Sequence, residues 1–128
     1  MATSTDGLAA AIIANNNNDK KQVHRGRFLN FNFAIKIDDE GYLIKVQKGK
    51  VEAVVPLERA TEKPVFTFAA DSKAWDVFSQ PLPPPGYQDV MALVECGHAQ
   101  LTGDVFPVLV NLFFVKGVVN GIRGRKSA

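Results

Sequence analysis

Few residues in this 128-residue chain have the types and spacings that enzymes use for catalysis. The two histidines, His24 and His98, lie far apart, and neither has partners at the spacing of a zinc ligand set. His98 is interpreted as a structural or surface histidine on a strand. The single cysteine, Cys96, stands among apolar residues, which predicts a buried structural side chain, and no base stands near it in the sequence. The sequence therefore predicts no metal site and no cysteine nucleophile.

The carboxylates also lack a catalytic arrangement. Asp38, Asp39 and Glu40 are adjacent, as expected of a solvated turn. The Gly-x-Ser-x-Gly elbow of serine hydrolases and the glycine-rich loops that hold nucleotides are absent from the sequence. Asp76 and Asp89 could form an acid–base dyad across two helices, which keeps a small enzyme with a cavity dyad as an alternative. The sequence favours a protein that is not an enzyme and that needs no cofactor.

The charge pattern argues against nucleic acid as a partner. The formal net charge is +2, which is too small to indicate a nucleic-acid-binding protein. Phe31 and Phe33 share their strand face with Ile35 and Ile37 rather than with basic residues, so we interpret them as packed. Basic residues gather over residues 20–27 and 123–126. Solvated loop ends explain both groups, and transient attraction to an anionic membrane surface is the alternative.

The apolar runs predict a cytoplasmic protein. Leu8–Ala14 has no basic residue before it and follows Asp6, so we interpret it as a short helix rather than a signal peptide. Val105–Val119 is too short for a membrane span and is interrupted by Asn111 and Lys116. One cysteine cannot form an internal disulfide, which fits a reducing compartment.

Periodicity of two begins at Phe28 and predicts the strands that would position a site. Leu29, Phe31, Phe33, Ile35 and Ile37 form one apolar face. Two further strands follow at residues 42–47 and 51–55, separated by short turns, so the three strands form an antiparallel meander. A fourth strand is predicted over residues 65–70 and a fifth over 98–102.

Helices are predicted between and after these strands. Asp71 or Ser72 can cap a helix that ends near Ser79. A second helix covers residues 87–95, and residues 81–86 form a rigid, proline-rich loop. Residues 7–14 form a first helix, which Asn15–Asn18 end. Because a strand returns after helices, the order predicts a single α+β domain with a mixed sheet and its helices on one face. Residues 1–6 and 121–128 are predicted to be flexible tails.

The segment Val105–Val119 is predicted to be one helix that is apolar nearly all round. A surface helix of a small domain buries one stripe only, so this helix must be covered on more than one side. Central packing or a homodimer interface explains it. The functional alternative is that one side lines an apolar cavity or its mouth.

The stretch Gly41–Val115 resembles the sterol carrier protein type 2 domain. Gly41–Val46 followed by Lys48–Val51 is similar to that family's hairpin. Phe66–Trp75 looks like its passage from strand to helix, and Gly97–Asp104 is similar to its short strand between two glycines. These motifs are structural rather than catalytic, and the Pro81–Gly86 loop departs from the animal carriers.

The resemblance implies a five-stranded, mainly antiparallel sheet covered on one face by helices, with an apolar tunnel between the layers. It also implies non-covalent binding and transfer of a sterol, fatty acid, acyl-CoA ester or phospholipid without a cofactor. Eight apolar residues are predicted to line the cavity: Phe33, Ile35, Trp75, Phe78, Met91, Leu109, Leu112 and Phe113. The alternative is an interaction or accessory module whose last helix packs on another chain through Phe114 or Val118.

Overall fold

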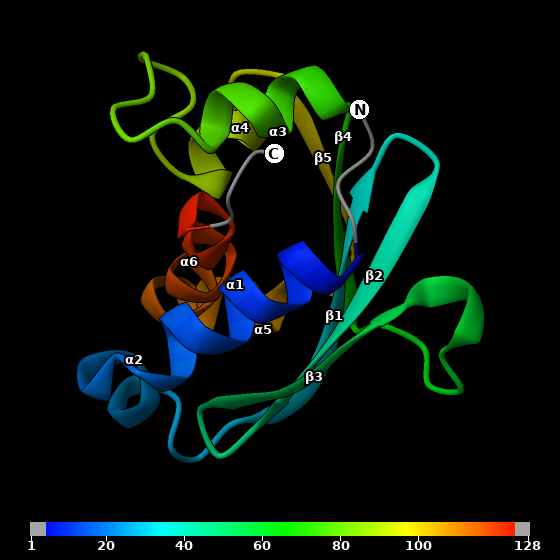
Figure 1. Cartoon of the computed structure of the whole chain (residues 1–128), viewed down its shortest axis with the longest axis vertical. Coiled ribbons are helices and arrows are strands. Elements are labelled where there is room, and N and C mark those ends of the chain that lie inside the picture. The colour runs from blue at the N-terminus through cyan, green and yellow to red at the C-terminus, as the bar shows by residue number, and fades with distance from the viewer. Residues whose placement is uncertain (1–4, 125–128) are drawn as a thin grey trace.

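The structure is a computed structural model that describes residues 5–124. Its centre is a five-stranded sheet with the strand order β3-β2-β1-β4-β5 (Figure 1). The strands are β1 (Asn30–Ile37), β2 (Glu40–Gln47), β3 (Lys50–Pro56), β4 (Phe66–Ala70) and β5 (Ala99–Gly103). The five strands predicted from the sequence are confirmed, and their boundaries differ from the prediction by one or two residues.

The first three strands form an antiparallel meander joined by two tight turns. Asp38 and Lys48 have positive φ values of 54° and 52°, and Gly49 follows at 81°. Positive φ in both central residues matches the right-handed twist of the strands that such a turn connects. Glycine adopts this conformation without strain, which explains Gly49 in the β2–β3 turn.

The sheet is mixed because β4 lies parallel to β1, while β5 returns antiparallel to β4. A parallel pair needs a long crossover, which here includes β2, β3 and the short η1 helix (Leu57–Arg59). This crossover places Leu57 against Gly41 on the outer face of the sheet.

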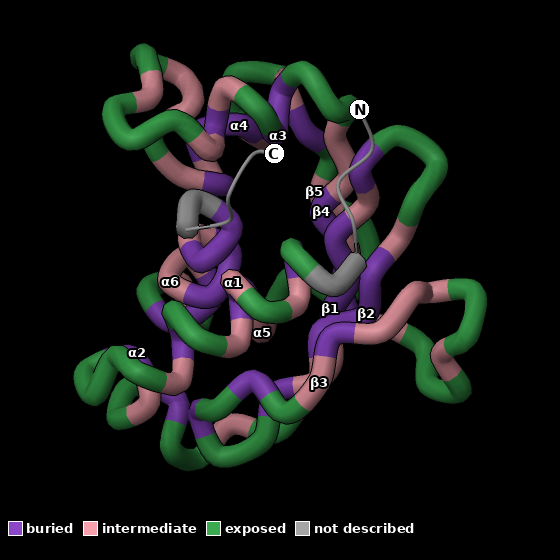
Figure 2. The backbone as a smooth tube through the Cα atoms, viewed as in Figure 1, coloured by how far each residue is buried: buried purple, intermediate pink, exposed green. Residues whose placement is uncertain are grey.

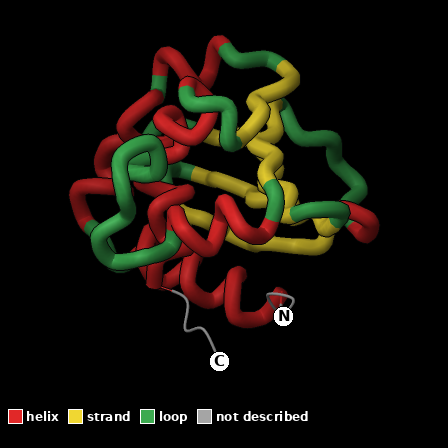
Figure 3. Tube along the Cα trace, turned by 90° about the horizontal axis from the view of Figure 1, so that it is seen from above, coloured by secondary structure: helices red, strands yellow, loops and turns green. Residues whose placement is uncertain are grey.

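The helices gather on the other, inner face of the sheet (Figure 3). They are α1 (Thr5–Asn17), α2 (Lys20–Arg25), α3 (Ser72–Phe78), α4 (Val90–Glu95), α5 (Phe106–Val110), α6 (Leu112–Asn120) and η2 (Gly121–Gly124). Asp71 caps α3, and its carboxylate accepts a hydrogen bond from the Ala74 N–H at 2.8 Å. The predicted fold class, an α+β domain with helices on one face of a mixed sheet, is confirmed.

The asparagine run does not end the first helix where the sequence predicts. The helix α1 continues to Asn17 because its asparagines bond to distant backbone groups rather than to their own turn. Asn15 donates to the carbonyl of Gly121 at 2.8 Å, and Asn16 donates to that of Gly49 at 2.9 Å. Asn17 both donates to the Val51 carbonyl and accepts from the Val51 N–H.

The segment that follows α1, which the sequence leaves as a polar lead into β1, forms the additional helix α2. Asp19 caps it by accepting hydrogen bonds from two backbone N–H groups. Gln22 is buried and donates from Nε2 to the Phe114 carbonyl at 2.6 Å. This bond fixes α2 to α6.

The last helix is divided in two, which corrects the prediction of one continuous helix over 105–119. At Asn111 the backbone leaves helical geometry, and the Asn111 side chain donates to the Pro107 carbonyl at 3.1 Å. The helix α6 buries Phe114, Val115, Val118 and Val119. In α5 only Val108 is buried.

Two further boundaries differ from the prediction. The helix α4 begins at Val90, where Asp89 caps it, rather than at Tyr87. Gly121–Gly124 forms η2, and Ile122 is fully buried, so this part of the predicted C-terminal tail packs in the core. Thr5 and Asp6 belong to α1. The rest of the predicted tails, residues 1–4 and 125–128, lies outside the described residues.

A candidate lipid-binding interior

The inner face of the sheet is continuously apolar. Phe33 and Ile35 of β1 pair with Ile44 and Tyr42 of β2, and each alternates with residues that face the other way. Phe66 and Phe68 of β4 extend the same surface. Figure 2 shows these central strands as the most buried part of the chain, together with α6. Alternating apolar residues on adjacent strands therefore build one wall of the interior.

Aromatic rings dominate one end of this wall. Phe33 and Phe66 stack with ring centroids 4.9 Å apart, and Phe68 meets Phe66 edge to face at 5.7 Å. Phe31 lies 5.8 Å from Phe66 and 6.4 Å from Phe114 of α6. Rings at these separations contribute attraction beyond the burial of their surface. The aromatic cluster thus ties β1, β4 and α6 together.

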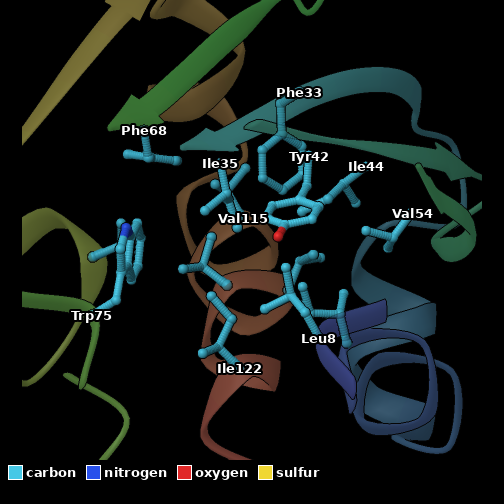
Figure 4. Packing of buried hydrophobic residues seen from close by; sticks show 14 of the residues in the cluster. Leu8, Phe33, Ile35, Tyr42, Ile44, Val54, Phe68, Trp75, Val115 and Ile122 are labelled. Carbon is cyan, nitrogen blue, oxygen red and sulfur yellow. The ribbon is translucent and has the colours of Figure 1, made fainter. Parts of the chain in front are cut away.

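Three helical segments supply the opposite wall. Figure 4 shows Val115 and Ile122 from the C-terminal helices and Leu8 from α1 pointing toward Ile35, Tyr42 and Ile44. All six of these side chains are buried. Trp75 of α3 closes one side and stacks edge to face on Phe78, with centroids 5.5 Å apart. The helical wall therefore combines segments from both ends of the chain, while the sheet wall comes from its middle.

Two polar groups that reach this interior are hydrogen-bonded to the protein. The Trp75 indole N–H donates to the Lys36 carbonyl at 2.9 Å. The Tyr42 hydroxyl donates to a carboxylate oxygen of Glu40 at 2.8 Å. A buried indole or phenol needs such a partner to offset the loss of water. The interior therefore offers hydrocarbon and aromatic surface to whatever it contacts.

The structure brings most of the predicted lining residues to this interior. Phe33, Ile35, Trp75 and Phe78 are fully buried. Met91 and Leu112 are half-buried and pack against the same core. Their assignment to a ligand cavity, as opposed to solid core, stays a prediction.

The other two predicted lining residues lie on the surface. Leu109 and Phe113 expose 62% and 72% of their surface. Phe114 and Val118, proposed for contact with another chain, are buried in the core instead. Leu109 and Phe113 lie on the exposed side of this segment, opposite the buried Val108 and Val115, and their assignment to the ligand site stays a prediction.

Other interior residues were missed by the sequence analysis. Leu8 and Ile12 are fully buried and lie four residues apart on α1, the spacing of one helix face. Phe66 and Phe68 alternate with polar or small residues on β4, a signal of the same kind as the one recognised in β1. Ile122 carried no such signal because it stands in a short segment rich in glycine and basic residues.

The candidate catalytic groups lie away from this interior. Cys96 is exposed, which corrects the prediction of a buried thiol. It occupies the C-cap of α4, where the helix ends at the surface. The His98 ring stacks on Tyr87 with centroids 4.3 Å apart, which supports a structural role for this histidine. Among the described residues, no three His, Cys, Asp or Glu side chains gather as a metal site would require.

The two carboxylates of the alternative dyad lie on different helices, Asp76 on α3 and Asp89 at the start of α4. Asp76 is exposed on α3. Asp89 caps α4 by accepting from the Ala92 N–H at 2.9 Å, and it lies 3.4 Å from Lys116 Nζ. For Asp89 the first contact is that of a helix cap, and the second is a partly exposed ion pair. The geometry therefore gives no observation in favour of the enzyme alternative.

Glu62 is an acidic group on the surface whose pKa is shifted. Hydrogen bonds from Lys45 and Thr61 lower the pKa of the Glu62 carboxyl, with the positive charge of Lys45 adding to the effect. Lys45 Nζ lies 2.9 Å from Glu62 Oε2. Structural ion pairs commonly shift a pKa in this direction, so the shift does not mark a catalytic site.

The surface hollows in the described part of the chain include two shallow ones. One lies between α1 and α2 and is lined by residues 14, 15 and 18–21. The other lies beside the β1–β2 turn and is lined by residues 38–39 and 69–71. Both are polar, and neither contains a residue predicted to contact a ligand. None of the described helices is long and apolar enough to cross a membrane.

Solved structures share this architecture along nearly the whole chain. A crystal structure of sterol carrier protein 2 superposes with a TM-score of 0.74 at 11% identity, covering 96% of this chain and 98% of the other. The chain has the sterol carrier protein 2 fold.

Two further similar structures point to the same fold. A conserved hypothetical protein from Thermus thermophilus, described as a candidate sterol carrier protein, gives a TM-score of 0.72 at 12% identity over 100% of this chain and 92% of that one. The SCP2 ubiquinone synthesis protein UbiJ gives 0.56 at 13% identity over 93% and 89%. No sequence model of a protein family matches the chain, and no curated protein matches it. The likeness is thus one of fold.

Proposed function

We propose that the apolar interior between the sheet and the helices binds the aliphatic part of a lipid and that the protein carries lipids without catalysing a reaction. The observation that carries the proposal is the continuous wall of buried apolar side chains from β1, β2 and β4, facing α1, α3 and α6 in the sterol carrier protein 2 fold. Sterols, fatty acids, acyl-CoA esters and phospholipids all offer a hydrocarbon part that such a wall would accept.

Burial of hydrocarbon would drive binding. Each methylene group moved from water into this interior contributes about 0.8 kcal/mol, so a long chain gains affinity without a charged anchor. The Trp75 indole N–H and the Tyr42 hydroxyl both donate to protein acceptors, so the surface around them offers mainly hydrocarbon to a ligand. The interior would therefore select for chain length and shape, while a polar headgroup would remain near the surface.

The predicted lining residues divide into an inner and an outer group under this proposal. Phe33, Ile35, Trp75 and Phe78 would contact the buried part of the ligand. Leu109 and Phe113, which are exposed, would stand where the ligand enters. The partly buried Met91 and Leu112 would lie between the two groups.

The first experiment is native mass spectrometry of the purified protein, followed by solvent extraction and lipid analysis. A mass above that of the bare chain, matched by an extracted lipid, is the expected result and would identify the ligand class. The second experiment is a titration with a fluorescent fatty acid below the concentration at which it forms micelles. The proposal would be contradicted if the mass spectrum showed no bound lipid and the titration showed no fatty-acid binding.

Matched variants test the proposed entrance. Phe113→Asp should weaken fatty-acid uptake, because a charge would stand where the chain passes. Leu82→Asp is the control, since Leu82 is 90% exposed in the proline-rich loop between α3 and α4. Equal uptake by the two folded variants would remove Phe113 from the site.

A further inference from the structure

One end of the sheet gathers several separate segments of the chain. Because β4 is parallel to β1 and β5 is antiparallel to β4, the starts of β1 and β4 and the end of β5 lie together. The β2–β3 turn lies at this same end, where Lys48 N–H donates to the Leu29 carbonyl. Asn16 fixes the end of α1, and with it α2, to this turn through Gly49. We call this end, with α2 and α5, the β1-start end; α2 and the β2–β3 turn lie at the bottom of Figure 1.

Large apolar side chains are exposed at the β1-start end. Phe28, directly before β1, is 80% exposed, and Phe106, directly after β5, is 68% exposed. Leu109 and Val110 on α5 and Phe113 on α6 are also mostly exposed. Two contacts show that these segments are close together. Gly26, at the end of α2, packs against the ring of Phe114 in α6, and the Asp104 N–H after β5 donates to the Val65 carbonyl before β4. Exposed apolar residues gathered in this way mark an interaction surface rather than ordinary surface scatter.

Basic residues surround these apolar side chains. Neither residues 20–37 nor residues 105–122 contain an aspartate or glutamate. Arg27 lies over the Phe28 ring at 4.8 Å, and Lys116 lies 5.9 Å from the centre of the Phe113 ring while also contacting Asp89. Further exposed cations at this end are Lys20, Lys21, Arg25, Lys48 and Lys50. The acidic groups near them are Asp19, Glu52 and Asp104.

The opposite end of the sheet is acidic. Asp38, Asp39 and Glu40 form the β1–β2 turn, and Asp71 lies beside them, since Ser72 N–H donates to Asp38 Oδ1. Lys73 and Arg59 are exposed cations toward this end. The molecule therefore has an electrical polarity along its strands, although its net charge is only +2. An anionic surface attracts the β1-start end and repels the other, which orients the molecule before contact.

We propose that the β1-start end docks on an anionic phospholipid bilayer, with Phe28, Phe106 and the exposed side of α5 inserted among the headgroups. Basic side chains around an apolar patch are the pattern that anionic lipid surfaces bind. A second copy of this chain fits the patch less well, because two-fold pairing would bring the basic ends of both copies together. The inference goes beyond lipid binding in the interior, since docking needs only the surface.

The test uses flotation with vesicles of phosphatidylcholine alone and with vesicles in which part of it is replaced by phosphatidylserine. The protein should float with the second kind and much less with the first, and added salt should reduce the binding because it screens exposed charges. Phe106→Ser with Val110→Ser should reduce binding by about tenfold or more, because two apolar side chains no longer enter the membrane. Leu82→Ser, an exposed apolar residue in the proline-rich loop, is the control and should leave binding unchanged.

A matched pair of charge variants tests orientation. Arg27→Glu with Lys50→Glu and Arg59→Glu with Lys73→Glu change the net charge by the same amount. The first pair should lower binding by at least twenty-five-fold, since each basic residue near the surface contributes about fivefold. The second pair should leave binding nearly unchanged, because those residues lie toward the acidic end.

Three results would overturn the inference. One is equal flotation with both kinds of vesicle, and another is equal loss in the two charge-variant pairs. The third is a dimer in sedimentation velocity that Phe106→Ser with Val110→Ser dissociates, with no vesicle binding by the wild-type protein. Fatty-acid titration without vesicles separates this inference from the proposed function, because Phe106 and Val110 are outside the predicted ligand lining. A docking variant that keeps full uptake while losing flotation is the expected pattern.

Discussion

Ile35→Phe distinguishes a ligand-holding interior from a solid core. Ile35 is fully buried on the inner face of β1, where its neighbours across the sheet are Tyr42 and Phe68. Its side chain points toward Val115 on the other wall (Figure 4). A phenyl ring at position 35 therefore enlarges the side chain at the centre of the proposed binding region without adding a polar atom.

The two interpretations predict opposite outcomes for stability. In a solid core, an added ring costs about 1–3 kcal/mol of overpacking, which lowers Tm by roughly 4–12 °C for a domain of this size. If the interior holds a lipid chain, the ring occupies ligand space, and Tm of the lipid-free protein stays constant or rises. A ring that displaces three methylene groups of the ligand, at about 0.8 kcal/mol each, weakens binding by about fiftyfold.

Thermal unfolding of delipidated protein and fatty-acid titration measure the two quantities. Leu43→Phe is the matched control, because Leu43 is fully buried but lies between the inward-facing Tyr42 and Ile44 of β2 and so faces the outer side of the sheet. The control should lower Tm without changing uptake by the folded protein. A fall of Tm in Ile35→Phe together with unchanged uptake would refute the ligand-binding interior.

Three further predictions concern single contacts. Asp71→Ala removes the cap that accepts from Ala74 N–H and should lower the free energy of unfolding by about 0.5–2 kcal/mol in denaturant titration, whereas Asp71→Asn should retain most of it. Cys96, being exposed, should react with a thiol reagent in the native protein as fast as in unfolded protein, and slow labelling would contradict its placement. Lys45→Gln should raise the pKa of Glu62 toward the ordinary value for a glutamate, as followed by NMR titration. Because the folded-state pKa of Glu62 is lowered, the stabilising effect of its contact with Lys45 is present at neutral pH and is lost as the pH falls through that pKa.

The strands and the fold class could be predicted because their signals are local. Alternation from Leu29 to Ile37 fixes which face of β1 is buried, and Gly49 marks the following turn. The order of strands and helices then restricts the topology to a mixed sheet with helices on one face. The inner wall of the candidate site follows from the same alternation.

The remaining differences arise from contacts between distant segments. Asn15–Asn17 stay helical because their partners lie at Gly49, Val51 and Gly121, which no local pattern can reveal. In the last helix Phe113 is exposed while the adjacent Phe114 is buried, and the nearly continuous apolar run around them does not indicate which of the two faces the core. An apolar sequence alone cannot assign its residues to a core, a ligand or a membrane.

The hydrogen bonds of α1 and α2 to the C-terminal segment also govern the order in which the protein can form. Asn15 reaches Gly121 across 106 positions, and Gln22 reaches Phe114 across 92. At a synthesis rate of about 5–20 residues per second, residue 15 waits roughly 5–20 s for its partner. During that time the meander can already pair, while the aromatic inner face of the sheet lacks α6. Newly made chains therefore pass through a stage with exposed phenylalanines, in which a chaperone or a lipid already bound to the sheet would prevent aggregation.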